Sequence, residues 1–167
     1  FEFGFNRMGT QGFGTPAWEN AFTQYVTQMR DHLAEKGIST KQFAWYWSDE
    51  PGGERWEKYD HPASKLLKKI DPQMLVWANP NSSVSVRQFE ASLPFVDLYC
   101  PAVGTLNSKA VLDVCRRTKQ KSWQYVCASE KNQDPFAYYR WMSWKAWKNG
   151  LGGIGMWVYV DPNARTF

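Results

Sequence analysis

The sequence predicts an α/β fold of the (β/α)8-barrel type, a partial TIM barrel in which this chain supplies about the last five strands. Two observations support this prediction. Short apolar or aromatic runs alternate with segments of helical periodicity, and polar or aromatic residues stand where the predicted strands end. Two neighbouring parallel strands must be joined by a crossover connection of a dozen or more residues. The alternation therefore predicts parallel βαβ units.

The first predicted helix follows a glycine-rich and aromatic opening segment, which is typical of a loop after a strand. Thr15 can cap this helix, Pro16 fits its first position, and Gly37 ends it. The apolar residues between these signals recur with the 3.6-residue period of a helix and are Phe22, Tyr25, Val26, Met29 and Leu33.

The rest of the chain alternates between predicted strands and helices. The strands are expected over 42–48, 74–78, 95–100, 122–127 and 153–160. The helices between them are expected over 62–70, 84–91, 108–119 and from Asp134 to Gly150. An open doubly wound sheet usually carries a glycine-rich phosphate turn after its first strand, and no such turn follows strand 42–48. A barrel is therefore favoured.

Composition and charge limit the possible partners and cofactors. The mean hydropathy of -0.57 and the lack of any run of about 18 apolar residues argue against a membrane span. The net charge of +4 comes from lysines and arginines spread over several segments, so no nucleic-acid partner is expected. His32 and His61 lie far apart, with no cluster of further ligands at metal spacing, so neither a metal nor another cofactor is expected. Three cysteines do not decide the compartment.

Aromatic residues are unusually frequent, because 10 Trp, 8 Tyr and 10 Phe make up 17% of the chain. Flat rings stack on the apolar faces of sugars, while their N–H and O–H groups bond hydroxyls. The excess therefore favours a carbohydrate site, although any single ring can equally well fill the core.

Two adjacent carboxylates, Asp49 and Glu50, directly follow strand 42–48, at the end where barrel enzymes build their active sites. The preceding run is aromatic and apolar, so at least one carboxylate is expected beside a partly desolvated pocket. Desolvation raises the pKa of a carboxyl group, as a general acid requires. In the structural alternative, Asp49 caps the next segment and Glu50 pairs with a surface lysine.

Five stretches, in the right order, resemble the catalytic domain of glycoside hydrolase family 123. They are WYWSDEP from Trp45, WANP from Trp77, YCP from Tyr99, WQYVC from Trp123 and YYRWMSWKAWKNGLGGIGMWVYVD from Tyr138. Members of that family are β-N-acetylgalactosaminidases with a barrel catalytic domain. They use an adjacent Asp-Glu pair in substrate-assisted hydrolysis.

The resemblance implies separate roles for the two carboxylates. Glu50 would be the general acid/base that protonates the leaving oxygen, and Asp49 would orient the 2-acetamido group of the substrate. The sugar then supplies its own nucleophile, which places such enzymes outside the usual two-carboxylate scheme. The same resemblance implies that Tyr125 bonds the acetamido oxygen and that Trp157 forms part of its apolar cradle.

Further substrate contacts are expected from the strand ends, at Asn79, Tyr99 and Tyr159, with Asp161 at the same rim. Two interpretations stay open for the loop 54–61, which carries Trp56 and Tyr59: it overhangs the sugar as a wall, or its aromatic rings pack against a neighbouring helix. For each aromatic residue, packing in the core is the alternative.

The expected partners are a glycan or glycoconjugate substrate and the remaining N-terminal part of the same barrel. The second expectation arises because the sequence opens Phe-Glu-Phe-Gly-Phe without an initiator Met, so residues 1–167 are interpreted as the C-terminal portion of a barrel catalytic domain.

Two other functions stay open at this point. In the first, Glu50 is again the acid/base and Glu130, which follows strand 122–127, is a protein nucleophile. In the second, the chain is a non-catalytic carbohydrate-binding barrel fragment.

Overall fold

The computed structural model describes residues 12–101, 109–126, 136 and 140–156, and every structural statement below concerns these residues. Their helices are α1 (Pro16–Glu35), α2 (Gly53–Arg55), the π-helix η1 (Trp56–Asp60), α3 (His61–Ile70), α4 (Val86–Ser92), α6 (Lys109–Thr118) and α7 (Trp141–Lys148). Their strands are β1 (Ala44–Trp45), β2 (Leu75–Ala78), β3 (Leu98–Tyr99), β4 (Trp123–Val126) and β5 (Gly153–Met156). No helix in this part of the chain is long and apolar enough to cross a membrane.

The strands pair in parallel and in chain order. One sheet has the order β1-β2-β3, and β4 pairs with β5 in a second sheet. A single parallel bridge between Tyr99 and Ser122 links the end of β3 to the start of β4. The predicted parallel order is thus confirmed. β1, β2 and β3 are shorter than predicted, and within the described residues the strands do not close into a barrel.

Helix α1 forms where the sequence predicts it. The Thr15 side chain accepts a hydrogen bond of 3.3 Å from the backbone N–H of Trp18, and Pro16 occupies the first turn. Beyond the helix, Gly37 has φ +77°, a left-handed conformation that glycine adopts without a steric penalty. The helix is therefore delimited by its own sequence at both ends.

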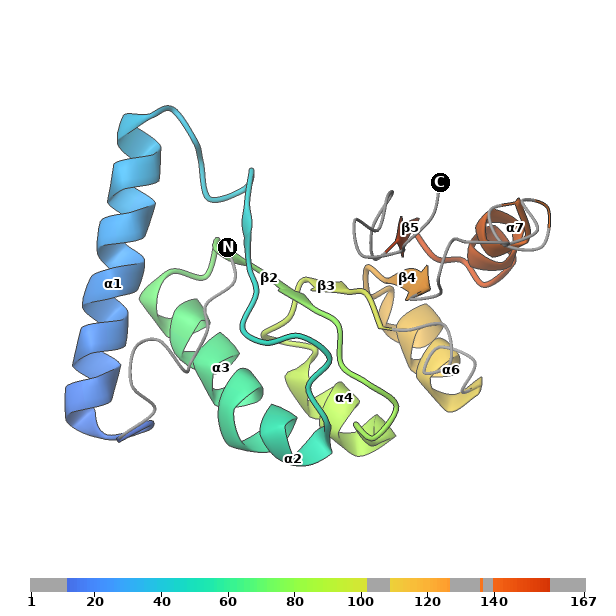
Figure 1. The fold of residues 1–167 in the computed structure, drawn as a ribbon, viewed down its shortest axis with the longest axis horizontal. Coiled ribbons are helices and arrows are strands. Elements are labelled where there is room, and N and C mark those ends of the chain that lie inside the picture. Colours follow the sequence, from blue (N-terminus) through green and yellow to red (C-terminus); the bar gives the residue numbers. More distant parts are fainter. Residues whose placement is uncertain (1–11, 102–108, 127–135, 137–139, 157–167) are drawn as a thin grey trace, which may run out of the picture.

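The hydrophobic core lies between the strands and the helices. Figure 1 shows α3 and α4 on one side of β2 and β3. Side chains alternate across a strand, so every second residue points into this layer. The ring of Trp45 lies 6.1 Å from that of Tyr25 in α1, measured between centroids. The ring of Trp47 lies 5.6 Å from that of Phe22 in the same helix. Tyr99 packs on Phe89 of α4 in the same layer.

The segment 54–61 is helical and does not form an overhanging loop. It forms α2, η1 and the start of α3, and Trp56 is only 1% exposed, with its ring 6.2 Å from that of Tyr99. Tyr59 packs edge-on against Phe13. Of the two interpretations, packing of the rings is the one found, because burial of a large indole against the sheet outweighs its exposure in a loop.

The other face of the strands carries the residues between those of the core. Tyr46 packs on Trp77, with ring centroids 4.5 Å apart, and the Trp77 side chain lies near the Cys100 thiol. A Cβ atom on Gly155 of β5 would lie 3.4 Å from Tyr125 Cβ and 3.6 Å from Cys100 Sγ. Residues of all five strands or their ends therefore meet on this face, which leads to the two carboxylates.

Candidate active site

Asp49 and Glu50 lie in the turn between β1 and α2. Glu50 has φ +43°, a left-handed conformation that is uncommon for residues other than glycine. Neighbouring residues of a regular strand point to opposite faces, and this turn breaks that alternation. Both carboxylates consequently bond to residues on the same side of the sheet.

Asn79, at the end of β2, links the two carboxylate residues. Its side-chain nitrogen donates to Asp49 Oδ1 at 2.8 Å, and its side-chain oxygen accepts the backbone N–H of Glu50 at 3.2 Å. The Tyr46 hydroxyl also donates to Asp49 Oδ1, at 2.6 Å. Two donors on one carboxylate oxygen leave Oδ2 of Asp49 as the oxygen that can face a ligand.

Tyr125 of β4 contacts the second carboxylate. Its hydroxyl donates to Glu50 Oε1 in a short hydrogen bond, and the Tyr125 side chain is buried. Residues 75 positions apart in the sequence meet in this bond. It connects the carboxylate turn of the first sheet with the second sheet.

The loop after β2 holds the backbone of the carboxylate turn. Asn81 donates from its side chain to the carbonyl oxygen of Glu50 at 3.0 Å and from its backbone to that of Pro51 at 3.1 Å. Ser83 accepts the N–H of Gly53 at 3.0 Å. The turn is thereby fixed on both sides of Pro51.

Asp49 and Glu50 are both exposed in the described part of the chain. The partly desolvated pocket expected beside them stays a prediction. Among the described residues, the structural alternative is not found. Gly52, not Asp49, is the cap residue of α2, and the hydrogen bond that the structure gives the Glu50 carboxylate comes from Tyr125. Hydrogen-bond donors orient both carboxylates: Tyr46 and Asn79 bond Asp49, and Tyr125 bonds Glu50.

The structure brings together four of the predicted site residues, namely Asp49, Glu50, Asn79 and Tyr125. Tyr99 lies elsewhere. It pairs with Ala78 in the parallel register and points into the helical layer, where it is 0% exposed and its hydroxyl bonds Ser92. Trp157, Tyr159 and Asp161 lie outside the described residues, as does Glu130.

Sequence reasoning missed two residues of this site, Tyr46 and Asn81. Tyr46 stands three residues before Asp49 and alternates with the buried Trp45 and Trp47, a spacing that places it on the carboxylate side. Asn81 follows Asn79 in the sequence Asn-Pro-Asn, where the second asparagine could have been recognised as a turn residue.

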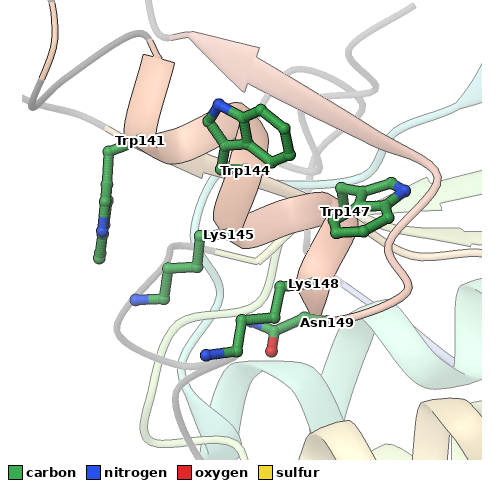
Figure 2. Close-up of a pocket in the computed structure, with 6 residues that line it drawn as sticks. All are labelled: Trp141, Trp144, Lys145, Trp147, Lys148 and Asn149. Atoms are coloured by element: carbon green, nitrogen blue, oxygen red, sulfur yellow. The ribbon is translucent and has the colours of Figure 1, made fainter.

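A separate surface pocket of about 370 Å³ lies on α7, away from these residues (Figure 2). Its lining consists of Trp141, Trp144, Lys145, Trp147, Lys148 and Asn149. The three indoles project from one helix, and Lys145 Nζ lies 4.5 Å from the centre of the Trp141 ring. The described residues that line this pocket include no carboxylate. Among the described residues, no group of three or more His, Cys, Asp and Glu is arranged to hold a metal ion.

Comparison with known proteins agrees with the chemistry of the carboxylate turn. The chain matches the family model described as "Glycoside hydrolase 123, catalytic domain" over residues 5–162. Searches of curated proteins and of solved structures found no match. Since the family match includes the carboxylate turn and nearly the whole chain, this chain belongs to glycoside hydrolase family 123 and is a glycoside hydrolase domain.

Proposed function

We propose that the domain hydrolyses β-linked N-acetylhexosaminides, with N-acetylgalactosamine as the preferred sugar, by a substrate-assisted mechanism that retains the anomeric configuration. The observation that carries this proposal is the Asn79 side chain, which bonds both members of the adjacent pair Asp49 and Glu50. Two neighbouring carboxylates held in one turn suit a reaction in which each acts on a different part of one sugar.

In the first step, the acetamido carbonyl oxygen of the sugar attacks C1 and the glycosidic C–O bond breaks. Glu50 transfers its proton to the departing oxygen. The product on the sugar is a cyclic oxazolinium ion, and the positive charge that develops there is stabilised by Asp49. Asp49 Oδ1 is occupied by Tyr46 and Asn79, so Oδ2 is the oxygen proposed to accept the acetamido N–H.

In the second step, water attacks C1, the bond from C1 to the acetamido oxygen breaks to regenerate the 2-acetamido group, and the Glu50 carboxylate takes the proton of the water, which restores the enzyme. Tyr125 supports this exchange because its hydroxyl donates to Glu50 Oε1 in the free enzyme. When substrate is bound, the same hydroxyl is proposed to bond the acetamido oxygen. Trp157 and Tyr159 are proposed to complete the sugar site.

The parallel strands in chain order support a further proposal, that these strands form about the last five of a (β/α)8 barrel. The face that carries Tyr46, Trp77 and Tyr125 would then be the interior face of the barrel, and the remaining strands would come from an N-terminal part of the same protein.

The 2-acetamido group provides the test of the mechanism. Full-length protein should hydrolyse an aryl β-N-acetylgalactosaminide and should fail on the matched aryl β-galactoside, whose 2-hydroxyl cannot form the ring. Comparable turnover of both glycosides would contradict the proposal and would favour a protein nucleophile such as Glu130. Folded protein that binds glycans without turnover would instead indicate a carbohydrate-binding domain.

A further inference from the structure

A buried carboxylate that the proposed reaction does not use lies beside the carboxylate turn. Asp60, the last residue of η1, is 2% exposed. Its Oδ1 accepts a short hydrogen bond from the Ser48 hydroxyl, and its Oδ2 has no hydrogen-bond partner among the described residues. A buried polar atom without a partner costs free energy, so such an arrangement calls for an explanation.

Charge neutralisation within the described part of the chain explains Asp60 only weakly. Its ion-pair partner there is Arg55 of α2, whose Nε lies 3.9 Å from Asp60 Oδ2 and whose side chain is 43% exposed. His61, the next residue along the chain, packs its ring near Phe95 instead. An exposed guanidinium at this distance compensates a buried carboxylate only weakly.

The bonds that Asp60 does make lead to the carboxylate turn. Ser48 immediately precedes Asp49, and its hydroxyl is the donor to Asp60. The backbone oxygen of Asp60 accepts the Ser64 hydroxyl at 2.8 Å, and Ser64 in turn accepts the Trp47 indole N–H at 2.8 Å. Two consecutive residues, Trp47 and Ser48, are thereby tied to the junction of η1 and α3.

We propose that Asp60 is a positioning residue, which fixes the start of the Asp49–Glu50 turn by holding the Ser48 hydroxyl. Asn79 and Asn81 hold the far side of the turn, and Asp60 holds the near side. The inference about catalysis rests on the proposed function, whereas the inference about the geometry of the turn does not.

The η1 segment and the protonation of Asp60 fit this role. A single turn of π-helix is rare and occurs frequently at functional sites, and here it places Asp60 under Ser48. Burial, opposed by the Ser48 bond and by Arg55, raises the pKa of Asp60 to about 6. The raised pKa reflects the cost of holding a charged carboxylate at this buried position, and protonation relieves that cost below about pH 6.

Amide hydrogen exchange tests the geometric role without any substrate. Ser48→Ala removes only the donor, Asp60→Ala removes the acceptor, and Asp60→Asn keeps an acceptor oxygen. In full-length protein, exchange at the Glu50 and Gly53 amides should speed up at least about 10-fold in the two alanine variants and stay near the wild-type rate in Asp60→Asn.

Ser92→Ala is the matched control, because Ser92 is also a buried serine and bonds Tyr99 in the helical layer. It should leave the Glu50 and Gly53 amides unchanged. Wild-type exchange at both amides in folded Ser48→Ala would overturn the proposal, and this holds even if Asp60→Ala fails to fold.

Kinetics test the catalytic consequence. Ser48→Ala should lower kcat on an aryl β-N-acetylgalactosaminide by about 10-fold with KM changed less than about 3-fold, since it displaces reacting groups rather than binding contacts. Asp60→Asn should retain most of the wild-type kcat. An unchanged kcat in Ser48→Ala would overturn this role. If the folded wild type hydrolyses no N-acetylhexosaminide, the proposed function fails and the exchange comparison alone decides the role of Asp60.

Discussion

The side-chain nitrogen of Asn79 donates a hydrogen bond of 2.8 Å to Asp49 Oδ1, and this bond joins the ends of two neighbouring parallel strands. The carboxyl ends of parallel strands meet at one edge of a sheet, so a polar residue after each strand reaches the other. Because the Asn79 oxygen also accepts the Glu50 N–H, one side chain sets the positions of both carboxylate residues.

Asn79→Ala should therefore lower kcat on aryl β-N-acetylgalactosaminides by about 10- to 100-fold, because Asp49 loses a donor and the Glu50 N–H loses its acceptor. Steady-state kinetics of the full-length protein provide the measurement. Asn149→Ala, an asparagine at the end of α7, is the control and should stay within about twofold of wild type. An Asn79→Ala enzyme as active as this control would show that the bond has no catalytic role.

Tyr125→Phe should lower kcat by about 10-fold, since the hydroxyl that bonds Glu50 is lost while the ring stays in place. Tyr99→Phe is the matched comparison, because the Tyr99 hydroxyl bonds Ser92 in the helical layer. That variant should lose thermal stability and keep its kcat. A fall in kcat for Tyr99→Phe together with an unchanged kcat for Tyr125→Phe would mean that Tyr99, not Tyr125, faces the substrate.

Trp56→Ala should lower the free energy of unfolding by about 3–5 kcal/mol, because it leaves a cavity where a fully buried indole packs on the sheet. Trp147→Ala should change it by less than about 0.5 kcal/mol, since that side chain is 74% exposed. Urea unfolding monitored by circular dichroism gives both values. A stable Trp56→Ala protein with weakened glycan binding would restore the predicted role of Trp56 as a wall of the sugar site.

Asp60 should make the stability of the domain depend on pH. Its pKa is raised from 3.8 to about 6 in the folded state, so the folded protein binds more protons than the unfolded chain between these values. Stability should fall as pH rises from about 4 to about 6, by at most about 3 kcal/mol from this group. In Asp60→Asn this fall should be absent, as urea unfolding at pH 4, 5, 6 and 7 would show. If the free energy of unfolding of the wild type and of Asp60→Asn depended on pH in the same way, the raised pKa of Asp60 would be contradicted.

Much of the fold can be predicted from periodicity and end signals. Thr15, Pro16 and Gly37 define α1 because each acts through local backbone chemistry. The parallel order follows from the lengths of the connections. Strand length and the helical form of the segment around Trp56 could not be predicted, because they depend on which rings the tertiary structure buries.

The site was predictable only in part, for a related reason. Asp49, Glu50 and Asn79 stand at strand ends, so their position in the sequence is informative. Tyr99 also ends a strand, but the register with Ala78 turns its side chain toward the helices. The link from Asp60 to Ser48 depends on the π-helical turn of η1, which has no simple sequence pattern.

The proposed division of labour between Asp49 and Glu50 is tested most directly by two isosteric variants and two leaving groups. Glu50→Gln removes the proton donor, so kcat should fall by about 10² to 10⁴ for an N-acetylgalactosaminide with a poor leaving group and by less for an activated aryl glycoside. Asp49→Asn removes the charge opposite the positive intermediate, so it should slow both substrates alike.

The measurement is therefore kcat/KM of both substrates with wild type, Asp49→Asn and Glu50→Gln in the full-length protein. We expect the ratio of kcat/KM between the activated and the poor leaving group to rise in Glu50→Gln and to remain unchanged in Asp49→Asn. Wild-type activity in Asp49→Asn, or a covalent sugar trapped on Glu130, would contradict substrate assistance.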